Sequence, residues 1–252
     1  MPFQRLIPTL LIDQGRLVKG VRYGDYKDAG APGTTARAHN YQGADELVVV
    51  DINAAKEGRV PDADTVRTIA AECEMPLCVG GGIKSLDDAR QVMAEGADKM
   101  MITTGAIDRP ELLTELATHY GAQAVVLGLD TIYTKSGQLM VFDHRTGSPV
   151  PDLEPDKWAK KAVDMGAGEI RIMSVNREGT REGYDFQLYE KLRESVNVPL
   201  LLEGGAGKLD HLVEAFTAGV DGVCVGAMLV FSDANLVKIK QHMVTRNINI
   251  RP

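Results

Sequence analysis

The sequence has few cysteines, and they form no disulfide or metal-binding pattern. Cys73, Cys78 and Cys224 are the three cysteines among 252 residues, with no CxxC spacing and no even count. We therefore expect reduced thiols in a cytoplasmic protein. The five histidines are scattered, and none pairs convincingly with a carboxylate at helical spacing, so we expect no metal site. Nothing in the sequence indicates a bound cofactor.

Long hydrophobic runs and an excess of positive charge are also lacking. No apolar run approaches the roughly 20 residues of a membrane span, and the apolar stretch near the start is too short for a signal peptide. The formal net charge of -7 argues against a nucleic-acid partner, which would require broad neutralisation of phosphates. No linker or low-complexity segment divides the chain, so we expect one domain over residues 1–252.

Eight short apolar runs recur along the chain, with amphipathic segments between them. The runs are mostly continuous in apolar character, which is typical of strands buried on both faces of a parallel sheet. Alternating units of about 30 residues indicate parallel β-α-β crossovers, and eight units indicate a closed (β/α)8 TIM barrel. The expected strands are residues 6–12, 47–50, 77–79, 99–102, 124–129, 170–173, 200–202 and 222–225, and expected helices include 62–73, 87–94 and 156–165.

Short motifs beside the expected strands repeat at half the chain length. GADE at 43–46 matches GAGE at 166–169, GG at 80–81 matches GG at 204–205, and GAD at 96–98 matches GVD at 219–221. The offsets are 123, 124 and 123 residues, which predicts two duplicated half-barrels of four units each. Chance recurrence of a common turn is the alternative, and three matched pairs in order argue against it.

Two glycine loops follow the expected third and seventh strands and indicate phosphate sites. Glycine lets backbone N–H groups approach an anion where a helix begins, and barrel phosphate sites favour this end of the strands. Two sites on opposite sides of one mouth predict a long ligand with a phosphate at each end; the alternative is that the glycines only form tight turns. The expected half-sites are Gly81, Gly82, Thr103 and Thr104 for the first, and Gly204, Gly205, Gly226 and Ala227 for the second.

Several blocks of the sequence resemble the cyclase subunit of imidazole glycerol phosphate synthase, over roughly residues 5–252. The blocks are RLIP…GRLVKG, GADEL…DI, VGGGI, GAGEI, GT…GYD and GGAGK. The resemblance implies a barrel that works with a glutaminase subunit, whose ammonia passes through the barrel. The family joins this ammonia to a bis-phosphorylated ribosyl aminoimidazole precursor and releases imidazole glycerol phosphate and an aminoimidazole ribotide.

The resemblance also implies two catalytic aspartates, at the ends of strands one and five, and one of them is missing. Asp130 occupies the strand-five position, whereas the strand-one position falls on Leu11, which cannot carry a proton. Loss of one general acid or base typically lowers a rate by about 10²–10⁴. Asp13 lies two residues further on, and we expect it beyond the strand end rather than in a substitute role.

Other positions expected at the mouth depart from the family. Glu203 stands where the family usually has serine, and a carboxylate beside a phosphate loop repels the phosphate. Ala227 replaces a hydroxyl donor, Thr103 replaces an asparagine, and Met173 replaces a small hydroxyl residue. Neutral drift is one explanation, but several such changes in one pocket favour a changed ligand.

Charged residues expected at the opposite end of the barrel keep the family pattern. Arg5, Glu46, Lys99 and Glu169 stand at or just before strands one, two, four and six. The resemblance implies that this ring of charges closes the barrel floor and gates ammonia entry; the alternative is that each side chain faces solvent. The residues that the resemblance assigns to the glutaminase docking surface are Asp45, Asp98 and Gln123.

The kept floor and the altered mouth predict a subunit that docks and activates a glutaminase, conducts its ammonia, and supplies another acceptor. Divergent family members are associated with amidination of N-acetylated sugars in surface polysaccharides, where a separate sugar amidotransferase acts. Two alternatives stay open: an active cyclase-lyase of histidine biosynthesis, and a non-catalytic scaffold. Residues 22–33 form a glycine-bracketed loop that is either a mobile lid or an ordinary surface loop.

Overall fold

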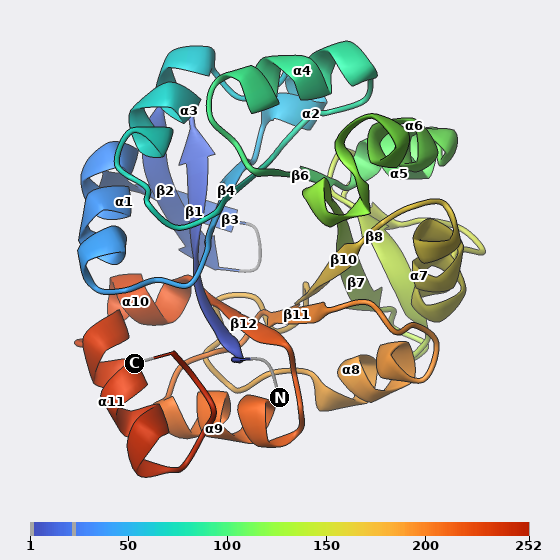
Figure 1. Cartoon of the computed structure of the whole chain (residues 1–252). Helices are drawn as coiled ribbons and strands as arrows, with labels where there is room; N and C mark the ends of the chain where they lie inside the picture. The colour runs from blue at the N-terminus through green and yellow to red at the C-terminus, as the bar shows by residue number, and fades with distance from the viewer. Residues whose placement is uncertain (1–2, 22–23, 252) are drawn as a thin grey trace.

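The computed structural model describes residues 3–21 and 24–251, and eight parallel strands in it form a closed barrel (Figure 1). Neighbouring strands pair in the order β10, β11, β12, β1, β4, β5, β6, β7, and the parallel pairing of β7 with β10 closes the circle. The expected barrel is confirmed. The barrel strands are β1 (Arg5–Asp13), β4 (Leu47–Asp51), β5 (Leu77–Gly80), β6 (Lys99–Ile102), β7 (Val125–Tyr133), β10 (Glu169–Ser174), β11 (Leu200–Glu203) and β12 (Gly222–Val225).

Helices form a ring outside the strands, as Figure 1 shows. Several begin at a polar side chain that accepts a hydrogen bond from the backbone N–H three residues further on, as Asp62 does for α3 and Ser85 for α4. Among the described helices, none combines the length and apolar character that crossing a bilayer requires. The helices are α1 (Pro32–Tyr41), α2 (Ala54–Glu57), α3 (Ala63–Ala70), α4 (Leu86–Ala94), α5 (Thr104–Asp108), α6 (Glu111–Tyr120), α7 (Pro155–Asp164), α8 (Phe186–Arg193), α9 (Leu209–Thr217), α10 (Ala227–Phe231) and α11 (Leu236–Thr245), with a short 3-10 turn, η1 (Ala122–Ala124).

Apolar side chains fill the inside of the barrel as well as the space between barrel and helices. Seven of the eight strands each contribute one residue to an apolar cluster inside the barrel, which we call the lumen layer. On β10 the residue paired in register with Leu201 of this layer is Arg171, so the eighth strand places a charge there. The lumen layer consists of Ile7, Val48, Cys78, Met101, Val126, Leu201 and Cys224.

The half-barrel repeat has a counterpart in the hydrogen bonds at the start of the strands. The carboxylate of Asp98 accepts a hydrogen bond from the backbone N–H of Leu77 at 2.8 Å. Asp221 accepts the corresponding bond from Leu200 at 2.9 Å. Both partners of the second bond lie 123 residues after those of the first, so the same connection recurs in the two halves.

The segment expected as a loop at residues 22–33 is mostly strand. β2 (Arg16–Val21) pairs antiparallel with the end of β1 and with β3 (Gly24–Gly30), while residues 22 and 23 lie outside the described residues. The expectation that Asp13 lies beyond the strand end was also wrong, because Asp13 pairs with Arg16 as the last residue of β1. A second hairpin extends β7 through β8 (Leu139–Asp143), which is followed by β9 (Ser148–Pro149).

A buried histidine on α1 predicts acid sensitivity of the fold. His39 is 8% exposed, its Nδ1 has no hydrogen-bond partner among the described residues, and burial lowers its pKa from 6.5 to about 4. The unfolded chain therefore binds a proton between these values that the folded chain does not, so stability falls as pH falls from 6.5 towards 4. We expect a loss of about 2 kcal/mol between pH 7.5 and 5 from this group. Urea unfolding at both pH values should show His39→Phe losing about that much less than the parent; equal losses would contradict the assignment.

Candidate functional site

A cavity of about 320 Å³ opens at the carboxyl ends of the barrel strands. β1 and β7 place Leu11 and Asp130 on its wall, and Arg171 lines it from β10. The four residues expected in the first half-site, Gly81, Gly82, Thr103 and Thr104, all line the same cavity. The chain thus brings the expected first half-site and the expected catalytic position together in one pocket.

Asp130 is buried and is held by two partners that the sequence analysis did not identify. His144 Nε2 lies 2.6 Å from Asp130 Oδ2, and Arg171 Nη1 lies 3.7 Å from Oδ1. Burial alone would raise the pKa of Asp130, but the charge and hydrogen bond of His144 and the charge of Arg171 outweigh burial and lower the pKa. Asp130 is therefore an ionised carboxylate that orients the imidazole beside it.

No proton-carrying side chain occupies the strand-one position opposite Asp130. Leu11 is 7% exposed and pairs in register with Val50 of the neighbouring strand β4. Asp13 shares the face of β1 on which Leu11 lies, since strand side chains alternate, but it is not among the residues that line the cavity. Asp51 does line the cavity, yet Arg59 Nη1 binds its carboxylate at 2.6 Å.

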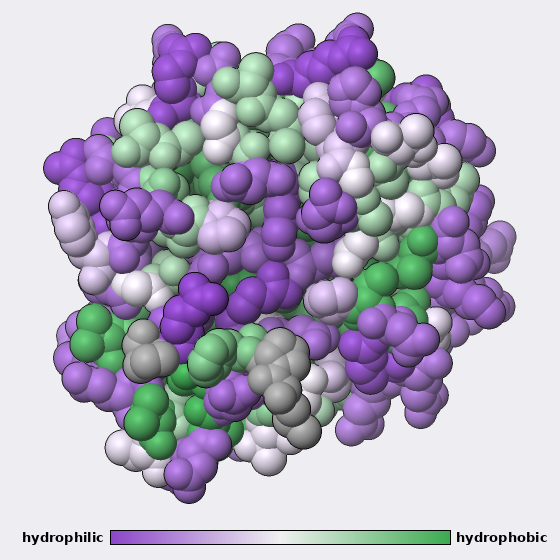
Figure 2. All heavy atoms as spheres, viewed as in Figure 1, coloured by the Kyte–Doolittle hydropathy of each residue, from purple (hydrophilic) through white to green (hydrophobic). Residues whose placement is uncertain are grey.

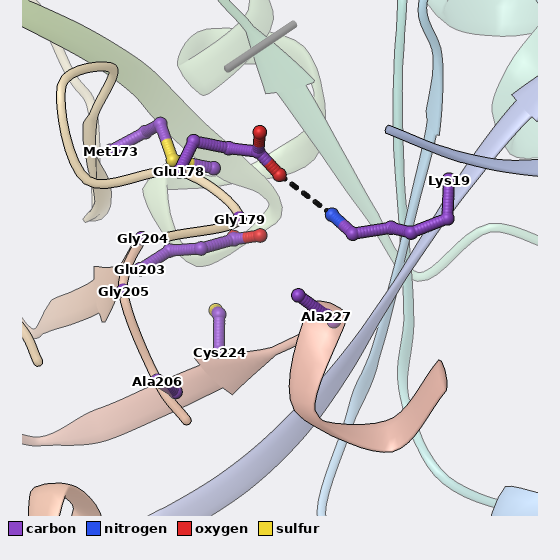
Figure 3. A pocket seen from close by; sticks show the side chains of 11 residues that line it. Lys19, Met173, Glu178, Gly179, Glu203, Gly204, Gly205, Ala206, Cys224 and Ala227 are labelled. Atoms are coloured by element: carbon purple, nitrogen blue, oxygen red, sulfur yellow. Dashed lines mark hydrogen bonds and ion pairs between the residues drawn. The ribbon is translucent and has the colours of Figure 1, made fainter. Parts of the chain in front are cut away.

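The expected second half-site forms a separate and much smaller pocket of about 20 Å³ (Figure 3). Lys19 reaches it from β2, and its Nζ lies 2.7 Å from Glu178 Oε1. Glu203 enters from the end of β11, is paired with Arg171 Nε, and accepts a hydrogen bond from Thr9 Oγ1 at 3.2 Å. The remaining expected residues that line this pocket are Met173, Gly204, Gly205, Gly226 and Ala227.

Backbone packing accounts for the glycines of both loops. Gly82 has φ +67, and a Cβ there would lie 1.8 Å from the carbonyl oxygen of Arg59. Gly205 has φ +103, and a Cβ there would lie 2.0 Å from the carbonyl oxygen of Gly183. Since L side chains rarely adopt such φ values and the neighbouring carbonyls leave no room, these turns require glycine whether or not an anion binds. Phosphate binding at the loops stays a prediction.

The four charged residues of the floor form one closed ring of ion pairs. Glu46 Oε2 lies 2.8 Å from both Arg5 Nη1 and Lys99 Nζ. Lys99 Nζ also lies 2.8 Å from Glu169 Oε2, and Arg5 pairs with Glu169 Oε1. Seen from this end in Figure 2, hydrophilic side chains gather over the middle of the barrel. The alternative of four separate charges facing solvent is wrong, and the gating role stays a prediction.

The two carboxylates of the floor ring differ in their environments. Both oxygens of Glu169 bind a cation, and although burial alone would raise the pKa of Glu169, Arg5 and Lys99 lower it. Only Oε2 of Glu46 is engaged, because Oε1 has no hydrogen-bond partner among the described residues. Burial and the nearby Glu169 raise the pKa of Glu46. A proton added to the ring therefore binds to Glu46 first.

The residues expected at the docking surface divide into two groups. Asp98 and Gln123 are exposed on the rim of the floor. Asp45 is buried, accepts a hydrogen bond from the backbone N–H of Leu6 at 2.8 Å, and lies 3.3 Å from Lys240 Nζ. The expectation that Asp45 belongs to a docking surface is therefore wrong, because its carboxylate is used inside the barrel wall. Within the described residues, no three His, Cys, Asp or Glu side chains gather as a metal site.

Comparisons with known proteins agree with this architecture. The family model described as "Histidine biosynthesis protein" matches residues 5–235. Proteins named imidazole glycerol phosphate synthase subunit HisF are similar along nearly the whole chain. The one from Anoxybacillus flavithermus is 40% identical over 98% of this chain and 99% of its own length. That from Streptomyces avermitilis is 41% identical over 94% of both chains, and that from Bacillus subtilis is 39% identical over 98% and 99%. The chain therefore belongs to the histidine biosynthesis protein family and is of the HisF type.

Proposed function

We propose that this HisF-type subunit docks and activates a glutaminase and conducts its ammonia through the barrel for amidination of a sugar in polysaccharide biosynthesis. The names of the relatives describe them as synthase subunits, which supports a partner subunit for this chain. The observation that carries the departure from histidine synthesis is Leu11, which lies where ring formation would need a second proton carrier opposite Asp130. The altered second half-site supports the same departure.

The floor and the lumen layer support the conduction of ammonia. Arg5, Glu46, Lys99 and Glu169 close one end, and the apolar lumen layer follows directly above them. An apolar path favours neutral ammonia over ammonium, because an unpaired charge in an apolar interior is strongly disfavoured. Nitrogen that enters at the floor would then reach the mouth as ammonia.

The residues at the mouth argue that cyclase activity is weak or absent. An efficient general acid or base has a pKa near the working pH, and the lowered pKa of Asp130 keeps this carboxylate ionised at neutral pH. His144 lies against Asp130, and Leu11 provides no proton carrier at the strand-one position. We therefore assign the amidination step to a separate sugar amidotransferase that takes up the ammonia.

The experiment for the docking part mixes the purified chain with its glutaminase and measures glutamine hydrolysis. We expect the chain to accelerate hydrolysis, and Gln123→Arg on the exposed floor rim to reduce the acceleration by weakening the complex. Glu182→Lys is the matched control, because Glu182 is exposed on the loop between β10 and α8 at the mouth. Equal activity of the two variants, or no acceleration by the parent chain, would contradict docking through the floor.

Two other functions make different predictions. An active cyclase-lyase of histidine biosynthesis would convert the precursor ribotide with ammonium salt as the nitrogen source. A non-catalytic scaffold would still support amidination after Lys99→Ala or Glu46→Ala, whereas a gated conduit would leak or stall. The family membership favours the cyclase-lyase as second candidate, and Leu11 and Glu203 argue against it.

A further inference from the structure

We propose that the second half-site receives a neutral hydroxyl or amine group of the ligand and excludes phosphate, so that the ligand carries a phosphate at the first half-site only. The second half-site is the pocket lined by Glu203, Gly204, Gly205, Gly226 and Ala227 (Figure 3). This inference rests on the proposed function and names the class of ligand that the same mouth accepts.

The size of the pocket is the first argument. Its volume is about 20 Å³, against about 320 Å³ for the cavity that contains the first half-site. A cavity needs about 10–15 Å³ measured in this way to hold one water molecule. The pocket therefore has room for one water, hydroxyl or amine group, whereas a phosphate group has a phosphorus and four oxygens to place.

The charges around the pocket are the second argument. Figure 3 shows Glu178 and Glu203 entering from one side and Lys19 from the other. The Lys19–Glu178 pair is buried, with side chains 8% and 5% exposed, and Arg171 is already bound to Glu203. A phosphate dianion would meet two carboxylates whose cations are in use, and like charges at this range repel strongly in a buried pocket.

The hydrogen-bonding groups of the wall are the third argument. Met173 and Ala227 line the pocket without a hydroxyl or amide hydrogen that could bind a phosphate oxygen through the side chain. The Glu203 and Glu178 carboxylates accept hydrogen bonds and do not donate them. Lys19 is paired with Glu178, so the other side chains of the wall favour the donor hydrogen of a hydroxyl or amine. The other half-site keeps Thr103 and Thr104, whose hydroxyls can donate to an anion.

The test uses inorganic phosphate as the probe and crystals of the full chain soaked in it. We expect the parent to show one phosphate, at Gly82 and Thr104, and none at Gly205 and Ala227. The double variant Glu178→Gln/Glu203→Ser removes both carboxylates, and the shorter serine side chain also enlarges the pocket. We expect it to show a second phosphate at Gly205, and the matched control Glu182→Gln, an exposed carboxylate nearby, to show one as the parent does.

Every other outcome would overturn the inference. Phosphate at both half-sites of the parent would show that the second half-site accepts an anion. Phosphate at neither half-site would contradict phosphate binding at the first. A double variant with one phosphate would show that the carboxylates do not exclude the second. If the double variant does not fold, Glu203→Ser alone carries the same expectation. These results are independent of glutamine hydrolysis by the pair, so the inference can fail while the proposed docking function holds.

Discussion

Replacing Arg171 with methionine should lower the free energy of unfolding by about 3–5 kcal/mol, because it leaves buried carboxylates without their cation. Arg171 is 4% exposed inside the barrel and pairs with Asp130 and Glu203, which are themselves buried. Glu203 loses more stabilisation than Asp130, because Asp130 Oδ2 still has His144 Nε2 as a partner at 2.6 Å. Removal of the Arg171 charge should also raise the pKa of Asp130 above that in the parent, since this charge helps to lower it.

Thermal and urea unfolding measure this loss directly. For a chain of this size a loss of 3–5 kcal/mol corresponds to a fall of about 6–20 °C in the melting temperature. The matched control is the double variant Arg171→Met/Glu203→Met, in which an apolar pair replaces the ion pair and most of the stability should return. An Arg171→Met variant as stable as the parent would show that Arg171 does not offset the charge of the buried carboxylates. A double variant no more stable than the single variant would show the same.

Replacing Lys99 with methionine should have the second-largest effect, because two carboxylates then share one cation. Lys99 Nζ is 2.8 Å from both Glu46 and Glu169, and without it Arg5 is the remaining cation of the ring. We expect a loss of about 3–5 kcal/mol at neutral pH. In the parent the pKa of Glu46 is already raised by burial and by Glu169, and loss of the Lys99 charge raises it further.

The pH dependence of the Lys99→Met variant follows from this raised pKa. A carboxyl group whose folded pKa lies above the unfolded value of 4.5 binds its proton more tightly in the folded chain. Its destabilising charge is present above the folded pKa and disappears as pH falls from that value towards 4.5. The stability gap between variant and parent should therefore narrow as urea unfolding is repeated at lower pH. The control Lys99→Met/Glu46→Gln should narrow the gap at neutral pH, and a pH-independent gap with no rescue would contradict the ring as described.

The strands of the barrel could be predicted because their apolar character is local. Burial on both faces of a parallel sheet requires continuous aliphatic runs, and the expected runs lie within a few residues of the observed strands. The floor ring was found through the resemblance, and its geometry follows from alternation, since Arg5 and Ile7 point to the same side of β1. The same alternation from Glu169 places Arg171 inside the barrel. The sequence analysis did not identify Arg171 as a lumen residue, because its apolar neighbours made the segment look like an uncharged strand.

The partner of Asp130 could not be predicted, because a hairpin brings it into place. His144 follows β8, which pairs antiparallel with β7. This pairing brings His144 beside Asp130, although the two residues are 14 positions apart in the sequence. No motif spacing encodes such a contact, since it depends on where the hairpin turns. Asp13 was misplaced for a similar reason: β1 continues beyond the barrel because it pairs with β2, which a barrel pattern does not contain.

The measurement that tests the central claim most directly is ammonium-driven conversion of the precursor ribotide by the purified chain, with the HisF subunit of Bacillus subtilis assayed beside it. The account predicts that the relative converts the ribotide while this chain, with Leu11 opposite Asp130 and Glu203 in the second half-site, does not. Glutamine hydrolysis by the same preparation with its glutaminase should proceed. Conversion of the ribotide by this chain at a rate comparable with that of the relative would contradict the account.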